Sequence, residues 1–337
     1  MLRATLRLRV TKLIVFSICK DEAATIGEVL DRIPDQLDGI DEIERWVITD
    51  GCQDNTADIA REHGAQVLEG QVQRRLAFRF QQAMALALRR GADIAVSIDG
   101  DLQFDPADIP AFVAPIVAKD ADFVAADRFT DPSTGQRRRP ENMPLGKYLG
   151  NRLGANIVGR LSSESFADVT CGFRAYNRKA MLALNINSKY TYTQESFQLL
   201  AFNQLDIVSI PTTVTYYPGR RSRVVTSFWQ FLLNSAVNIL RAFRDFAPLR
   251  FFGMLATLPL VLGGLGGGFV AIHWLRTDRT SPYTSLGILG AYLFSLGLII
   301  LVVGLLADML GRSTRNQEKI MQELKIIRYG DHPGDEQ

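Results

Sequence analysis

Two long stretches without charged side chains, near the end of the 337-residue chain, limit its fold more than any other feature. Residues 251–275 contain no Asp, Glu, Lys or Arg, and neither do residues 284–307. Each stretch is longer than the ~20 residues that a helix needs to cross the hydrocarbon core of a bilayer. Because only the short segment 276–282 joins them, the sequence predicts a transmembrane hairpin whose two ends lie on one side. The alternative, two buried helices of a soluble domain, would need a large surrounding core.

Basic side chains are unevenly placed around this hairpin. Those on the flanks that adjoin the rest of the chain are Arg241, Arg244, Arg250, Arg312, Arg315 and Lys319. The tip holds only Arg276 and Arg279. Since basic residues favour the cytoplasmic side of membrane helices, we expect a multi-pass protein of the cell (inner) membrane with both termini in the cytoplasm. Three scattered cysteines, without paired spacing, agree with a reducing compartment.

The chain before the hairpin alternates short apolar runs with helical stretches from Lys12 onward. This alternation favours an α/β domain with a doubly wound, mostly parallel sheet. Ligands of such sheets bind at the carboxyl ends of the strands. Acidic residues follow three of the predicted strands, at Asp21 and Glu22, at Asp50, and at Asp99 with Asp101. We therefore expect an acidic rim along this edge of the sheet.

The most informative of these strand ends is Asp99-Gly100-Asp101, which follows the apolar run 94–98. Gly100 allows a sharp turn, so the two carboxylates can converge, and adjacent carboxylates repel unless a cation lies between them. Hard oxygen ligands suit Mg²⁺ or Mn²⁺, with substrate phosphates completing the shell. Gln103 offers a further oxygen. The alternative is a solvated turn that contains two aspartates.

These features divide the chain into four parts. We expect a cytoplasmic α/β domain over residues 1–225 and an amphipathic helix on the membrane surface over residues 226–250. Two transmembrane helices, at about 251–275 and 284–307, then make up residues 251–307, and a cytoplasmic tail follows at 308–337. The net charge of +2 gives no support for nucleic acid as a partner, whereas the hairpin makes the lipid bilayer one.

An ordered series of short motifs resembles those of a known family. It consists of SICKDEAATIG, VITDGCQDNT, AFRFQQAMALALRRGAD, IDGDLQFDP, ADRF, CGFRAY and YTQE. Together with the hairpin, the series resembles the inverting family 2 glycosyltransferases of the dolichol-phosphate mannose synthase and bacterial polyprenyl-phosphate glycosyltransferase type. The resemblance extends over about residues 12–329. It implies a GT-A (Rossmann-like, mostly parallel sheet) catalytic domain followed by a C-terminal two-helix transmembrane hairpin.

On the donor side, the resemblance implies roles for six residues. Glu22 and Asp50 would contact the nucleotide base and ribose, and Arg79 would lie near the donor. Asp99, Asp101 and Gln103 would hold the metal and the donor diphosphate. Two positions depart from the family's usual residues, Cys19-Lys20 in the first motif and Thr49 before Asp50, so the choice between UDP and GDP stays open.

On the acceptor side, the resemblance implies that Arg128, Arg152 and Asn156 contact the acceptor phosphate. Arg174 and Glu195 would line the sugar and acceptor pocket. Arg174 would also contact the nucleotide-sugar. Arg221 and Arg223 would bind the lipid head group or the donor phosphates. The residues expected to carry catalysis are Asp99, Asp101, Arg128, Arg152 and Glu195.

The reaction that the resemblance implies is inverting transfer of a sugar from a UDP- or GDP-linked nucleotide-sugar to undecaprenyl or dolichyl phosphate, by a protein that forms homo-oligomers. A phosphate monoester has a second pKa near ~6, so at pH 7 it needs no strong general base.

Two alternatives stay open: a glycosyltransferase that acts on a hydroxyl acceptor, such as a glycolipid synthase, and a catalytically inactive membrane partner protein. A processive polymerase is disfavoured because Trp46, Trp229 and Trp274 lie outside any QxxRW motif. A dehydrogenase is disfavoured because no GxGxxG motif follows the first strand.

Overall fold

The structure is a computed structural model that describes residues 10–162, 164–186, 192–216, 244 and 247–329. Contacts between residues divide the chain into two compact units. The first unit combines Met1–Phe228 with Met321–Gln337, and the second is Trp229–Ile320. The first unit is therefore discontinuous in sequence, since the second is inserted into it.

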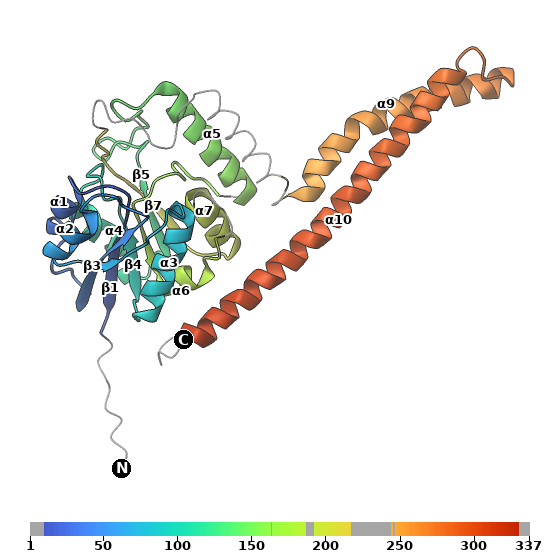
Figure 1. Ribbon diagram of the computed structural model, residues 1–337. Coiled ribbons are helices and arrows are strands. Elements are labelled where there is room, and N and C mark those ends of the chain that lie inside the picture. Colours follow the sequence, from blue (N-terminus) through green and yellow to red (C-terminus); the bar gives the residue numbers. More distant parts are fainter. Residues whose placement is uncertain (1–9, 163, 187–191, 217–243, 245–246, 330–337) are drawn as a thin grey trace. The chain divides into compact units, whose positions relative to one another are not determined.

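A seven-stranded sheet forms the centre of the first unit (Figure 1). Its strands are β1 (Lys12–Cys19), β2 (Glu42–Thr49), β3 (Gln66–Leu68), β4 (Ile94–Ser97), β5 (Phe123–Asp127), β6 (Arg174–Asn177) and β7 (Ile207–Pro211). They lie in the order β3-β2-β1-β4-β6-β5-β7. All paired strands are parallel except that β6 runs antiparallel to both β4 and β5. The prediction of a mostly parallel sheet is confirmed.

Helices cover both faces of this sheet. They are α1 (Ile26–Asp31), α2 (Thr56–Glu62), α3 (Leu76–Arg89), the 3-10 turn η1 (Pro106–Asp108), α4 (Ile109–Val117), α5 (Leu145–Ser162), α6 (Arg178–Ala183) and α7 (Thr193–Phe202). Side chains alternate between the faces along each strand. Ile14 and Phe16 of β1 accordingly join one apolar cluster with α3, α5, α6 and α7, whereas Leu13 and Val15 join another with α1, α2 and α4.

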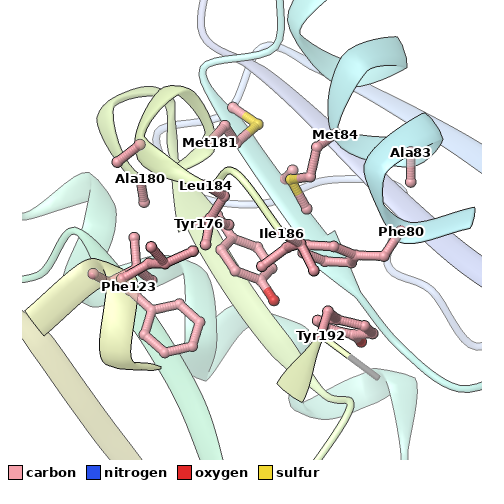
Figure 2. Close-up of a cluster of buried hydrophobic side chains, with 14 of the residues drawn as sticks. Phe80, Ala83, Met84, Phe123, Tyr176, Ala180, Met181, Leu184, Ile186 and Tyr192 are labelled. Carbon is pink, nitrogen blue, oxygen red and sulfur yellow. The ribbon is translucent and has the colours of Figure 1, made fainter. Parts of the chain in front are cut away.

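Aromatic rings pack tightly in the first of these clusters (Figure 2). The Phe80 ring of α3 stacks on Tyr192 with centroids 3.7 Å apart and lies 5.8 Å from Tyr176 of β6. Tyr176 in turn lies 5.0 Å from Phe123 of β5. This packing ties the antiparallel strand β6 to its neighbours. β6 begins at Arg174, directly after a turn in which Cys171 Sγ accepts the Phe173 amide (3.4 Å).

The second unit contains α9 (Pro248–Thr277) and the part of α10 (Thr284–Tyr329) that precedes Met321. Both helices are long and apolar enough to cross a membrane, and only 17% and 11% of their most apolar segments are buried. The predicted spans 251–275 and 284–307 lie within them. The predicted surface helix 226–250 lies outside the described residues, except for Arg244 and residues 247–250.

Glycines bring α9 and α10 close together (Figure 1). A Cβ atom at Gly290 of α10 would lie 2.7 Å from the Gly267 nitrogen of α9. One at Gly263 of α9 would lie 2.4 Å from the Phe294 nitrogen. The two backbones can approach this closely because no side chain separates them, which is the packing mode of small residues in membrane helices.

The end of α10 belongs to the first unit. Lys325 Nζ donates to the Leu184 carbonyl (2.6 Å), and Arg178 Nη2 donates to the Tyr329 carbonyl. The Tyr329 side chain packs against the apolar cluster of α3, α6 and α7. Burial lowers the pKa of the Lys325 amine to about 8. The last turns of α10 are thus part of the unit that contains the sheet.

Candidate active site

Strand register brings the predicted site residues to one edge of the sheet. Cys19 pairs with Thr49, so the segments that begin at Lys20 and at Asp50 leave the sheet side by side. Ser97 of β4 pairs with Arg174, the first residue of the antiparallel strand β6, so the loop before β6 lies at the same edge. Asp127 of β5 and Pro211 of β7 are paired as well. The expected acidic rim is therefore confirmed, and the loops after β5 and β7 add to it.

Asp99 and Asp101 form the acidic centre of this rim. Burial, and then the charge of Asp101, raise the pKa of the Asp99 carboxyl to about 7. Asp101 Oδ1 accepts the Gln103 amide (3.1 Å), which turns the chain back around the carboxylate. Two carboxylates that repel each other in a partly buried site are suitable ligands for a divalent cation that prefers hard oxygen atoms.

Two glycines make room for this centre. A Cβ atom at Gly172 would lie 2.8 and 2.9 Å from the two Asp99 oxygens, so the space beside this carboxylate exists only because residue 172 has no side chain. A Cβ at Gly100 would lie 2.6 Å from Cys19 Sγ. The Gly100 carbonyl accepts the Thr25 hydroxyl (2.6 Å), which fixes the turn between the two aspartates. These contacts fit a site shaped to leave the Asp99 oxygens accessible to a metal ion.

Asp50 and Arg79 hold a neighbouring loop. Asp50 accepts the backbone amides of Arg74 (2.7 Å) and Arg75 (3.0 Å) and Arg79 Nε (2.9 Å). Arg79 also donates to the Val72 carbonyl (2.6 Å). Both side chains are nearly completely buried. They therefore shape the loop at residues 72–75, and a direct contact of either with the donor stays a prediction.

The segment around Glu22 is tied to the loop after β2. The Thr56 hydroxyl accepts the Glu22 amide (2.9 Å). The side chains of Asp21, Cys52 and Asp54 place their possible ligand atoms within 4.8 Å of one another. Asp21 follows β1 and the other two follow β2, and each of the three accepts a backbone amide hydrogen bond from the other of these two loops. These bonds keep Glu22 on the rim, at an intermediate exposure.

Arg128, directly after β5, forms a buried ion pair that the sequence did not reveal. Its Nε and Nη2 donate to Asp168 Oδ2 (2.5 Å) and Oδ1 (2.9 Å), and Nη2 also donates to the Thr170 hydroxyl (2.5 Å). Its Nη1 donates to the Tyr216 hydroxyl (3.1 Å). Burial alone would raise the pKa of Asp168, but the Arg128 charge holds it below its usual range. No spacing in the sequence links residues this far apart.

α5 carries the two other residues predicted to contact the acceptor phosphate. Arg152 is half-buried, and its Nη1 donates to the Tyr148 hydroxyl (3.4 Å). Asn156 is exposed and lies on the same face of the helix as Leu149 and Leu153. Lys147, which the sequence did not single out, lies on the opposite, inner face, with its amine 5.1 Å from the centre of the Tyr216 ring.

Arg174 lies deeper than the sequence suggested. It is fully buried and donates to the carbonyls of Cys171 (2.7 Å), Val169 (3.1 Å) and Thr193 (2.9 Å). Its guanidinium therefore holds the loop before β6, which contains Gly172, by donating hydrogen bonds to the carbonyls of that loop. Glu195 lies in the first turn of α7 at an intermediate exposure. Arg221 and Arg223 lie outside the described residues.

The sequence and the structure both match known proteins. A sequence model described as Glycosyl transferase family 2 matches residues 14–184, just over half of the chain. The chain is 24% identical over 315 residues to glycosyltransferase AglJ of Haloferax volcanii, covering 90% of this chain and 95% of that protein.

Two further matches extend this picture. The chain is 25% identical over 299 residues to an undecaprenyl-phosphate 4-deoxy-4-formamido-L-arabinose transferase of Shewanella sediminis, covering 81% and 84% of the two chains. The structure of this chain resembles that of glucosyl-3-phosphoglycerate synthase of Mycobacterium tuberculosis in complex with Mn²⁺, UDP-glucose and phosphoglyceric acid. The TM-score is 0.51 at 20% identity, over 68% of this chain and 79% of that one.

Proposed function

The chain belongs to glycosyl transferase family 2 and has the GT-A fold, and on this basis we propose that it transfers a sugar from a nucleotide-sugar to a polyprenyl phosphate. The donor is a UDP- or GDP-sugar, and the acceptor is undecaprenyl or dolichyl phosphate. Transfer inverts the anomeric carbon and takes place on the cytoplasmic face of the membrane. The Shewanella sediminis relative, which is named as an undecaprenyl-phosphate sugar transferase, supports this class of acceptor.

The observation that carries the proposal is the juxtaposition of acidic and basic groups on one rim. Asp99 and Asp101 follow β4, and Arg128 follows β5, two strands further along the sheet. Carboxylates can bind the diphosphate of the donor through a metal ion, and an arginine can bind the phosphate of the acceptor directly. The two apolar helices of the same chain give it a means of reaching a lipid acceptor.

On the donor side, Asp99, Asp101 and Gln103 would hold Mg²⁺ or Mn²⁺. When bound, such an ion neutralises charge on the departing nucleoside diphosphate. The loop held by Asp50 and Arg79 borders the same edge and is suited to enclose the nucleotide. Arg174 supports this arrangement by holding the loop that carries Gly172, which leaves the Asp99 oxygens open.

On the acceptor side, a phosphate oxygen attacks the anomeric carbon from the face opposite the nucleoside diphosphate. The new bond joins this oxygen to the sugar while the bond to the leaving diphosphate breaks, so the configuration inverts. The phosphate is mostly dianionic at pH 7, and the reaction needs orientation more than proton removal. Asp168 fixes the guanidinium plane of Arg128 by accepting two parallel hydrogen bonds. The third guanidinium nitrogen, Nη1, is directed toward Tyr216.

The test is transfer by the purified full-length chain in lipid nanodiscs. UDP- and GDP-sugars are supplied singly with Mg²⁺ or Mn²⁺, together with undecaprenyl phosphate, dolichyl phosphate or undecaprenol. We expect one donor to give a lipid-linked monophosphate sugar of inverted anomeric configuration, and only from the phosphate acceptors. Asp101→Ala should lower the rate by about 100-fold or more, because a carboxylate of the metal site is lost.

Three outcomes would contradict the proposal. Equal transfer to undecaprenol would favour the hydroxyl-acceptor alternative. Absence of any product with every donor would favour an inactive membrane partner. Full activity of Asp101→Ala would remove the proposed metal site. Binding of UDP or GDP in the presence of Mn²⁺, measured by calorimetry, shows independently whether the donor site is formed.

A further inference from the structure

We infer that Lys147 binds the acceptor phosphate together with Arg128, and that the Tyr216 ring holds its amine in place. This inference rests on the proposed function and adds a residue that selects a phosphate acceptor over a hydroxyl. Lys147 lies in the first turn and a half of α5, whereas Arg128 follows β5 and Tyr216 follows β7. Three separate parts of the chain therefore meet at this point.

The two faces of α5 determine where Lys147 lies. Asn151, Ala155 and Val158, at helical spacing from Lys147, are 9%, 1% and 4% exposed and form the inner face of the helix. Leu149 and Leu153 are both 54% exposed and form the outer face. Lys147 belongs to the inner face and is half-buried. Its amine is thereby directed toward the rim, whereas Asn156 belongs to the outer face.

Arg128 and Lys147 differ in their counter-ions within the described part of the chain. Asp168 neutralises Arg128 through two hydrogen bonds, so this pair contributes little net charge. Among the residues that the structure describes, no carboxylate lies within the 4.0 Å of an ion pair with Lys147. Burial lowers the pKa of Lys147, and the Arg128 charge lowers it further, while Asp168 and Asp101 act in the opposite sense. A half-buried ammonium without a counter-ion is costly, and a bound anion removes that cost.

Tyr216 connects this ammonium to both halves of the site. Its ring lies 5.1 Å below Lys147 Nζ, within the range of a cation–π contact. Its hydroxyl accepts Arg128 Nη1 (3.1 Å). The preceding residue, Thr215, donates its amide to the Gln103 carbonyl (2.9 Å), two residues from Asp101. Through Tyr216, Lys147 is therefore connected both to Arg128 and to the loop that carries Asp101, so these groups can meet one phosphate beside the donor.

A dianionic phosphate matches this arrangement better than a hydroxyl does. Arg128 can donate hydrogen bonds but its charge is already paired, whereas Lys147 supplies the unpaired positive charge. A neutral hydroxyl would leave that charge uncompensated. The pair therefore discriminates by charge, because a partly desolvated ammonium costs free energy unless an anion pairs with it.

The test compares three lysine variants in the transfer assay with the preferred donor. Lys147→Met removes the charge, Lys147→Arg keeps it, and Lys119→Met is the matched control, since Lys119 is exposed at the end of α4. We expect Lys147→Met to raise the KM for undecaprenyl phosphate by about tenfold or more, because a charge-assisted contact is lost. The KM for the donor and Mn²⁺-dependent UDP or GDP binding should stay unchanged, which also reports on correct folding.

We expect Lys147→Arg to recover most of the acceptor affinity and Lys119→Met to match the wild type. An unchanged acceptor KM in Lys147→Met would overturn the inference. So would a raised donor KM with an unchanged acceptor KM, because that result would assign Lys147 to the donor diphosphate. Failure of the proposed function has a different signature: the wild type then forms no lipid-linked sugar from any phosphate acceptor, and the inference fails with it.

Discussion

Three arginines near the rim, Arg79, Arg128 and Arg174, are buried and donate several hydrogen bonds inside the protein. A guanidinium offers five donors in a fixed plane, so one such side chain can hold several carbonyls or a carboxylate at once. Arg79 anchors the loop at residues 72–75, whereas Arg128 and Arg174 both anchor the loop before β6. Removing any of their partners would leave a buried charge unsatisfied, which costs more than the loss of one ordinary hydrogen bond.

Glu44 shows the same effect at the opposite edge of the sheet and gives a prediction for pH. It accepts Arg90 Nη2 (2.6 Å) and Trp46 Nε1 (2.8 Å), and Lys12 Nζ lies 2.5 Å away. Burial alone would raise the pKa of Glu44, but hydrogen bonds from Arg90, Lys12 and Trp46 lower it to about 2. Since the folded pKa lies below the unfolded value, the stabilisation is complete above about pH 4.5 and is lost as the pH falls toward 2.

We therefore expect Glu44→Gln to lower the free energy of unfolding by about 2 kcal/mol at pH 7. The difference from the wild type should shrink between pH 4.5 and pH 3, measured as the thermal midpoint at each pH. Glu42→Gln is the control, because Glu42 also pairs with Lys12 but is half-exposed. A difference that stays constant over this pH range would show that Glu44 acts by packing alone.

At the scale of elements, the close approach of α9 and α10 depends on glycines that repeat along one face of α10. Gly290, Gly297 and Gly304 are seven residues apart, and each lies against α9. A Cβ at Gly297 would lie 2.5 Å from Leu260 Cγ, and one at Gly304 would lie 2.8 Å from Phe252 Cβ. A seven-residue repeat keeps one face of a helix against an antiparallel partner over several turns.

Gly290→Leu should separate the two helices, because the leucine would have to occupy the position of the α9 backbone. The measurement is oxidative cross-linking of Gly266→Cys with Leu286→Cys, because a Cβ at Gly266 would lie in ordinary contact with Leu286 Cδ1, at 3.7 Å. We expect the cross-linking yield to fall by about half or more with Gly290→Leu. Gly264→Leu is the matched control, since a Cβ there meets no atom within 4 Å. Equal yields from both variants would mean that the glycine contacts do not hold the hairpin together.

Element types and the acidic rim could be predicted from the sequence because both depend on local patterns. Apolar runs followed by acidic residues mark strand ends, and parallel strands bring those ends to one edge. The direction of β6 could not be predicted, because residues 174–177 carry no local signal of which neighbours they pair with. The partners of Arg128 were missed for the same reason: Asp168 and Tyr216 are 40 and 88 residues away in the chain.

At the scale of the whole molecule, the unit that contains the sheet draws on two distant parts of the chain. Lys325 and Tyr329 are bonded to Leu184 and Arg178, and Tyr329 packs on the apolar core. The unit is therefore complete only when the end of α10 is present. The polar composition of this segment gives no local signal that it packs on the sheet unit, so the sequence predicted a tail over residues 308–337 without this contact.

Removal of Met321–Gln337 should destabilise this unit. Two hydrogen bonds at about 1 kcal/mol each and the burial of Tyr329 are lost, so we expect the thermal midpoint of nucleotide-protected unfolding to fall by about 5 °C or more. The control chain lacks only residues 330–337 and keeps Tyr329. If the two truncated chains unfold at the same temperature, the end of α10 contributes nothing to the unit.

The discontinuity of this unit also sets an order of events during synthesis. Chains emerge from the ribosome with the N-terminal part first, so Met1–Phe228 is complete before Met321 has been translated. Both apolar helices are made in the interval. The core of this unit consequently receives its final piece only after the hairpin has been synthesised, and a chain arrested within the hairpin would present an unfinished core to cellular proteases.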